Sequence, residues 1–397
     1  MDLPKPKKRS NRLLLKQKKE VAEDEPKNRF GHLPPEIAKD ILSRLPNVKS
    51  IIQFRSVCRS CELWSHDSHV FRMHFSRSSS TGSKLLYFYS SNEELHFVEF
   101  SDINEEGLIA RKIQNAFVDL TPRSFWVYGS SNGIMILQDL HNWKWNCLYN
   151  PFTRDYKLVP ELDGSSSFSY WWPACHPVTN DYKIFAIRPM YNSKEFWSMV
   201  YVYSMSRNEW TKLGEFSFKV EDQSENKGVL VNGRLHCLTV KGKLTRFLNI
   251  TSIGIMDYSV KEVPMPAEVI FKNSKRSQLA VLGGCLSVGV RRVDSRMHIW
   301  VMKTYEMESS WVKQYVFGAE FLKFDRNWRS RGKEMLRIVC LLNKEEILLV
   351  YDGYGGYGQG DLISYNVVTK GYKTLTFGGT LLTTSFRTTV DTCCWSA

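Results

Sequence analysis

The chain has 397 residues, a formal net charge of +13, and a composition that is 43% hydrophobic and 13% aromatic. This composition excludes a disordered chain and is sufficient for two or three domains with sizeable cores. The apolar runs are far shorter than the ~18 residues that a membrane span requires, so we expect a soluble intracellular protein that does not bind membranes.

The first segment, residues 1–29, is predicted to be a disordered basic tail because it has few apolar residues and blocks of both charges. Residues 1–30 carry ten basic and five acidic side chains. Two basic clusters in this segment are typical of a nuclear import signal, with a solubilising tail as the alternative. The residues of the import-signal candidate are Lys7, Lys8, Arg9, Lys18 and Lys19. We therefore expect the protein in the nucleus, the cytoplasm or both.

The rest of the positive charge is spread over the remaining chain. It lacks the alternation of aromatic and basic residues that base-stacking surfaces use, so nucleic acid is an unfavoured partner.

The region that follows the tail predicts short helices. Pro34 and Pro35 suit a helix start, Glu36 falls in the first turn, and apolar residues then recur at spacings of three and four. Pro46 ends this helix, and a second apolar set continues to Trp64. Three short helices of this length cannot bury enough apolar surface on their own, so we expect part of that surface to contact another molecule or domain.

Three motifs in this region carry a resemblance to a known family. They are LPPEI at 33–37, ILSRLP at 41–46 and FRSVCRS at 54–60. Together they resemble the F-box motif, which implies a three-helix domain over residues 30–75 that docks onto a Skp-type adaptor and through it onto a cullin. By this resemblance the apolar contacts with the adaptor would come from Leu33, Pro34, Ile37, Ile41, Leu45 and Val57.

One position departs from the family pattern. Cys61 stands where the family usually has tryptophan, and Trp64, one helical turn later, offers compensating aromatic volume. The spacing of Cys58, Cys61, His66 and His69 raises the alternative of a zinc site. We expect no metal, because the two cysteines share a helix face that the core already uses.

Residues 76–83 are serine-rich and are predicted to be a linker. From residue 84 onward, short apolar and aromatic segments alternate with Asn-Gly and Gly-Gly turns, as in antiparallel strands. The first unit is predicted as strands over 130–137 and 145–149, and a turn and strand over 150–158. The next units include strands over 182–187 and 199–203, over 253–258, and over 279–290, 297–305 and 311–317, and the last includes strands over 338–342 and 347–351. A period near 50 residues predicts six or seven β-propeller blades.

Three turn motifs, GSSNG at 129–133, YNPFTR at 149–154 and HPVTNDYK at 176–183, resemble the F-box-associated domain of plant F-box proteins, a kelch-like propeller. The resemblance covers most of residues 84–390 and implies an α+β multidomain chain, with a small three-helix F-box followed by an all-β propeller. These motifs suit structural turns and indicate no ligand.

No motif predicts catalysis. Residues 353–358 match G-x-G-x-x-G, but the next segment reads as a strand, and a phosphate site requires a helix there. We expect a loop at these residues and no cofactor. An aromatic ligand cage is a further alternative, although we expect these side chains to belong to the core between blades. The tryptophans concerned are Trp126, Trp143, Trp145, Trp171, Trp172 and Trp197.

The resemblances imply a non-catalytic substrate-recognition subunit of an SCF-type (Skp–cullin–F-box) ubiquitin ligase. The F-box would hold the adaptor and the propeller would hold an unknown target protein for ubiquitination. Two alternatives remain open at this point: a propeller scaffold that no longer engages the adaptor, and a nuclear protein that binds nucleic acid through the basic tail.

Overall fold

The computed structural model describes a set of segments between residues 33 and 391. They are residues 33–45, 48–54, 56–65, 67, 69–70, 73–74, 77, 85–89, 95–99, 110–112, 125–131, 133–139, 145–151, 155–162, 170–176, 178–179, 181–192, 195–221, 228–241, 247–269, 277–291, 296–317, 335–352, 360–375 and 389–391.

Three short helices come first: α2 (Pro35–Ser43), α3 (Val48–Phe54) and α4 (Arg59–Ser65). Both α2 and α3 contact α4. Helix α2 begins where the prolines predict, because Pro35 occupies the first helical position, at which no backbone N–H is needed. None of the helices in the described segments has the length and apolar content that a bilayer crossing needs.

The remaining described chain is almost entirely strand. The strands are β1 (Leu85–Tyr89), β2 (Leu95–Glu99), β3 (Ala110–Lys112), β4 (Phe125–Ser131), β5 (Ile134–Asp139), β6 (Asn146–Tyr149), β7 (Tyr156–Val159), β8 (Tyr170–Cys175), β9 (Tyr182–Tyr191), β10 (Phe196–Ser204), β11 (Glu209–Phe216), β12 (Lys219–Val220), β13 (Val229–Val231), β14 (Arg234–Lys241), β15 (Phe247–Gly254), β16 (Val260–Val263), β17 (Ser277–Leu282), β18 (Cys285–Arg291), β19 (Met297–Met302), β20 (Trp311–Phe317), β21 (Met335–Leu341), β22 (Glu346–Asp352), β23 (Gly360–Asn366), β24 (Tyr372–Thr374) and β25 (Thr389–Asp391). A 3-10 turn, η3 (Glu308–Ser310), precedes β20.

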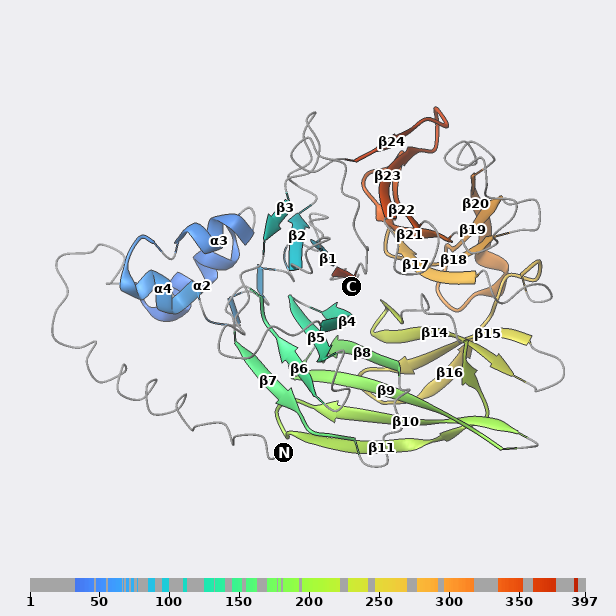
Figure 1. The fold of residues 1–397 in the computed structure, drawn as a ribbon, viewed down its shortest axis with the longest axis horizontal. Helices are drawn as coiled ribbons and strands as arrows, with labels where there is room; N and C mark the ends of the chain where they lie inside the picture. The colour runs from blue at the N-terminus through green and yellow to red at the C-terminus, as the bar shows by residue number, and fades with distance from the viewer. Residues whose placement is uncertain are drawn as a thin grey trace.

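Within the described residues these strands form six antiparallel sheets of four or five strands. In chain order, five of the sheets are β4–β7, β8–β11, β12–β16, β17–β20 and β21–β24, and the sixth joins β1, β2 and β3 to β25. Neighbouring sheets contact one another, as β4 contacts β8, β9 contacts β12, β14 contacts β17 and β17 contacts β21. The sheets therefore surround a common centre, which is the arrangement of a β-propeller (Figure 1).

The ring is closed by strands from the two ends of the domain. β25 pairs antiparallel with β1, with Thr389 opposite Tyr87 and Asp391 opposite Leu85, and β25 also contacts β4. The last strand of the chain thus supplies the inner strand of the first sheet. Closure of this kind removes an exposed inner edge to which another chain could add a strand.

The core lies between neighbouring sheets. Successive residues of a strand point to opposite faces, so adjacent side chains enter different core clusters. Trp171 packs with the preceding sheet β4–β7, whereas Trp172 packs with the following sheet β12–β16. In the same way, Leu279 packs toward sheet β12–β16 and Ala280 toward sheet β21–β24. Because both faces are covered, adjacent residues of these strands can both be apolar and buried.

The turns between strands explain where the predicted boundaries were wrong. The strand predicted over 130–137 is a hairpin whose turn contains Gly133, and the strand predicted over 279–290 is a hairpin with the turn Gly283-Gly284. Both of these glycines have φ values, +57° and +77°, that side chains disfavour. The strand predicted over 253–258 lies instead at 247–254, and the residues after Gly254 form a turn.

Candidate functional site

Helix α2 has two apolar faces rather than the single predicted stripe. Ala38 and Leu42 are buried, while Ile37 and Ile41 are 51% and 43% exposed. Ile51, Cys61 and Val70 are also buried, and α2 and α3 both contact α4. The exposed pair is one helical turn apart and therefore lies on the same side of α2.

The residues that are predicted to contact the adaptor differ in their exposure to solvent. Pro34, Ile37 and Ile41 are exposed on or next to α2, and Val57, in the connection between α3 and α4, is 53% exposed. Leu33 and Leu45 are half-buried. Leu63 on α4 is also exposed, although no sequence motif had singled it out. Isoleucine, valine and leucine side chains left in water around a small domain are typical of a protein-binding surface.

Polar contacts attach α2 to the residues that follow α4. The Asp40 carboxylate accepts from the Arg77 guanidinium at 2.5 Å and from Arg44 at 2.9 Å, and these contacts lower the pKa of Asp40. Lys39 and Asp67 form an ion pair at 2.7 Å. These contacts hold Lys39 and Asp40 of α2 against the residues that follow α4. The packing of the helical domain therefore does not depend on Ile37 and Ile41.

The two cysteines of the zinc alternative lie side by side. Their Sγ atoms are 2.9 Å apart, and Cys58 Sγ accepts from the backbone N–H of Cys61 at 3.3 Å. Cys61, at the family's tryptophan position, is fully buried, and Trp64 beside it is half-buried. His69 is exposed and His66 lies outside the described residues, so the four residues of the zinc alternative are not seen together.

A second site lies in the propeller, at one end of neighbouring sheets. A cavity of about 780 Å³ is formed by turns of sheets β4–β7 and β8–β11, together with Tyr258 from the β15–β16 turn. Asn150 of the predicted turn motif at 149–154 and His176, Thr179 and Asp181 of the motif at 176–183 line its wall. Sequence reasoning assigned these motifs to structure alone, because nothing in one sequence shows that two turns some 25 residues apart meet at one cavity.

Asp181 organises the wall on the side of sheet β8–β11. Its carboxylate pairs with Lys183 at 2.7 Å, both side chains being more than 90% buried, and accepts from Ser204 Oγ at 2.6 Å and from Ser206 N at 2.8 Å. Burial alone raises the pKa of Asp181, but the bonds from Lys183, Ser204 and Ser206 outweigh it and lower the pKa. The ionised carboxylate thereby holds the β10–β11 turn in place.

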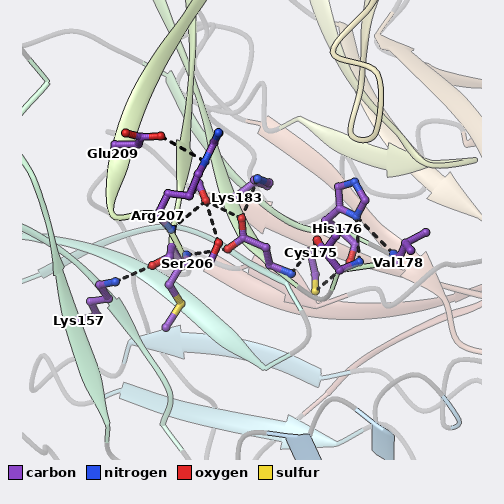
Figure 2. A network of polar contacts seen from close by, with 12 residues as sticks. Lys157, Cys175, His176, Val178, Lys183, Ser206, Arg207 and Glu209 are labelled. Carbon is purple, nitrogen blue, oxygen red and sulfur yellow. Dashed lines mark hydrogen bonds and ion pairs between the residues drawn. The ribbon is translucent and has the colours of Figure 1, made fainter.

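Two further side chains complete the polar wall. Lys157 in β7 donates from Nζ to the carbonyl oxygen of Met205 at 2.6 Å, which joins the two sheets across the cavity (Figure 2). His176 accepts at Nδ1 from the backbone N–H groups of Val178 and Thr179, at 3.3 and 3.2 Å. Both groups are part of the cavity lining.

The other sequence predictions have mixed outcomes. Trp171 and Trp172 are buried in the core between sheets, which confirms that interpretation for these two residues. Trp143, the G-x-G-x-x-G segment at 353–358 and the import-signal candidate (Lys7, Lys8, Arg9, Lys18 and Lys19) lie outside the described residues.

Comparison with known proteins gives the following similarities. A family described as "F-box associated beta propeller domain" matches residues 84–392. The chain is 31% identical to "F-box protein At3g07870" of Arabidopsis thaliana, over 87% of this chain and 88% of that protein. It is 24% identical to "F-box protein CPR1" of the same plant, over 71% and 72% of the two chains. Among solved structures, TolB from Acinetobacter baumannii aligns with 82% of this chain and 71% of its own at 9% identity, with a TM-score of 0.45.

Proposed function

Since the chain belongs to the plant-type F-box proteins that carry an F-box-associated β-propeller domain, we propose that it is the substrate-recognition subunit of an SCF-type ubiquitin ligase. The helices α2 to α4 would hold a Skp-type adaptor, which in turn binds a cullin. The propeller would hold a target protein. The subunit itself would be non-catalytic.

The observation that carries the proposal is the pair of exposed isoleucines on α2. Ile37 and Ile41 lie in water while Ala38 and Leu42, one residue further along, fill the helical core. Burial of an exposed aliphatic side chain in an interface is worth about 1.5–3 kcal/mol. A chain that leaves two such side chains, together with Val57, exposed around one small domain is suited to docking on a partner.

The mechanism that we propose is proximity. A target bound to the propeller shares one assembly with the charged ubiquitin-conjugating enzyme, which raises the effective concentration of the target's lysines near the reactive thioester. This role requires binding and orientation from the chain, and no acid, base or nucleophile.

The test is binding of the purified full chain to a Skp-type adaptor, measured by calorimetry. The variant Ile37→Ala/Ile41→Ala removes two exposed side chains and should fold normally. Interface anchors typically contribute ~2 kcal/mol or more, so we expect adaptor affinity to fall at least 30-fold. The matched control is Val178→Ala/Val368→Ala, which truncates two propeller residues that are 70% and 65% exposed, and should bind like wild type.

The outcomes separate the proposal from its alternatives. Failure of the wild-type chain to bind the adaptor would leave a propeller scaffold without a ligase role. Wild-type affinity in the isoleucine variant would show that another surface is used. Salt-sensitive binding of RNA or DNA that is lost on deletion of residues 1–29 would instead favour the nucleic-acid alternative.

A further inference from the structure

The cavity between sheets β4–β7 and β8–β11 is lined by charged side chains of both signs. Three cationic side chains line it, Lys157, Lys183 and Arg207, against two acidic ones, Asp155 and Asp181. The charge of Lys183 is paired with Asp181 at 2.7 Å. Arg207 contacts Glu209 at 3.3 Å, where both side chains are more than half exposed.

Lys157 differs from the other two cations. It is half-buried, and its partner among the described residues is the neutral carbonyl oxygen of Met205, at 2.6 Å. An ammonium group can donate three hydrogen bonds, and this one uses a single bond to an uncharged group. A partly desolvated charge in that position is stabilised most by an anion, because charge-assisted hydrogen bonds are about twice as strong as neutral ones.

His176 adds a directed donor to the same cavity. Its Nδ1 accepts two backbone N–H groups, so a neutral ring carries its proton on Nε2. Among the described residues Nε2 has no partner. The β8–β9 turn thus holds the ring through Nδ1 (Figure 2), which leaves the N–H at Nε2 available to a ligand.

The rest of the wall contains neutral polar residues together with apolar and aromatic ones, which include Ile134, Leu148 and Tyr156, the last of which is 48% exposed. A volume of about 780 Å³ is in the range of pockets that hold a few side chains. The ligand that matches this wall has one anionic group beside apolar surface.

We propose that this cavity binds a segment of the target protein in which an aspartate or glutamate side chain stands next to an apolar residue, with Lys157 as the principal contact of the carboxylate. The inference rests on the proposed function only in that it takes the ligand to be the recruited target. A protein segment fits better than a nucleic acid, since a lone carboxylate needs a single cation, whereas the successive phosphates of a strand would need several.

The test begins with a random decapeptide library displayed on phage and panned against the purified full chain. We expect enrichment of peptides that carry Asp or Glu beside an apolar residue. One enriched peptide is then synthesised with its acidic residue and with the isosteric amide, and both are titrated into the wild-type chain. The amide form should bind at least tenfold more weakly, because it loses a charge-assisted hydrogen bond.

The matched protein variants are Lys157→Met and Lys261→Met. Lys261 occupies the second position of β16, as Lys157 does of β7, but it is exposed and does not line the cavity. Lys157→Met should lower affinity for the acidic peptide at least tenfold and should not discriminate between the acid and amide forms, while Lys261→Met should behave as wild type. The acid and amide comparison on the wild-type chain needs no variant, so it decides the matter even if Lys157→Met is unstable.

Three results would overturn the proposal. They are a library without enrichment of acidic residues, equal affinity of the wild-type chain for the acid and amide peptides, and a Lys157→Met variant that still prefers the acid peptide over the amide peptide as strongly as wild type does. Tight, salt-dependent binding of a single-stranded oligonucleotide that is lost in Lys157→Met would assign the cavity to nucleic acid instead. Adaptor binding is measured on the same samples and should be unchanged in Lys157→Met. A failure of the pocket is therefore distinguishable from a failure of the ligase role, which only the adaptor measurement reports.

Discussion

The indole N–H of Trp210 in β11 donates to the backbone carbonyl oxygen of Pro160, at 2.8 Å. Trp311 in β20 makes the same bond to Pro264, at 2.9 Å. Each proline directly follows the last strand of one sheet, β7 or β16, and each tryptophan lies at the start of the last strand of the next sheet. The same side-chain bond thus joins two different pairs of neighbouring sheets.

The first prediction concerns this bond. Trp311→Phe keeps an aromatic ring but removes the N–H and part of the buried volume, so the free energy of unfolding should fall by about 1–3 kcal/mol. Urea denaturation measures the change. Tyr191→Phe is the control, because Tyr191 is 84% exposed and its change should stay within about 0.5 kcal/mol. An unchanged urea midpoint in Trp311→Phe would mean that the bond adds nothing to stability.

The second prediction concerns Gln278, which joins β17 to β21. Its Nε2 donates to the carbonyl oxygen of Leu336 at 3.0 Å, and its Oε1 accepts from the N–H of Ile338 at 3.2 Å. Gln278→Met would leave both backbone groups without these partners, at a cost of about 1–3 kcal/mol for each buried group. The exposed Gln314→Met is the control for urea denaturation. Equal midpoints for the two variants would contradict this role.

The third prediction concerns pH and His236. Burial lowers the pKa of His236 to about 4, and its Nε2 lies 2.7 Å from the Tyr305 hydroxyl. An unfolded histidine binds a proton near pH 6.5, so the unfolded state gains protons first as the pH falls. The contribution of neutral His236 is therefore complete above about pH 6.5 and is lost between pH 6.5 and 4, by up to about 3 kcal/mol.

The free energy of unfolding, measured across that pH range, checks this sign. His236→Gln should flatten the decline between pH 6.5 and 4, whereas the exposed His69→Gln should leave the wild-type slope in place. A His236→Gln curve parallel to wild type would show that other groups cause the acid sensitivity.

The fourth prediction concerns the thiols of the helical domain. Cys61 is fully buried, and burial raises its pKa to about 12, whereas Cys58 is half-buried. The thiolate is the reactive form, so N-ethylmaleimide should label Cys58 well before Cys61 in the folded protein. Peptide mass spectrometry resolves the two sites, and labelling in urea gives the reference in which both react. Comparable labelling of Cys61 without denaturant would show that the helices open readily.

The sequence predicted the elements whose signal is local. Pro34 and Pro35 indicated the start of α2, and glycine-containing turns indicated a succession of hairpins. It did not predict that adjacent residues such as Trp171 and Trp172 would serve two different core clusters, since that depends on which sheets become neighbours.

The candidate sites also differ in whether their sequence signal is local or depends on the folded arrangement. The family motif identified Ile37, Ile41 and Val57, and the structure places all three in solvent. The cavity around Lys157 was missed, because its wall combines a strand of one sheet with turns of the next at a separation of about 20 to 50 residues. Only the folded arrangement shows that Lys157 donates to the carbonyl oxygen of Met205.

The pairing of β25 with β1 has a consequence for synthesis of the protein. About 300 residues separate the two strands, so a ribosome that adds about 5–20 residues per second needs about 15–60 s between making β1 and making its inner neighbour. During that time β1 has an unpaired edge on a nascent chain, which exposes it to chaperones and to other chains. A stop codon before Thr389 would leave the same edge open permanently.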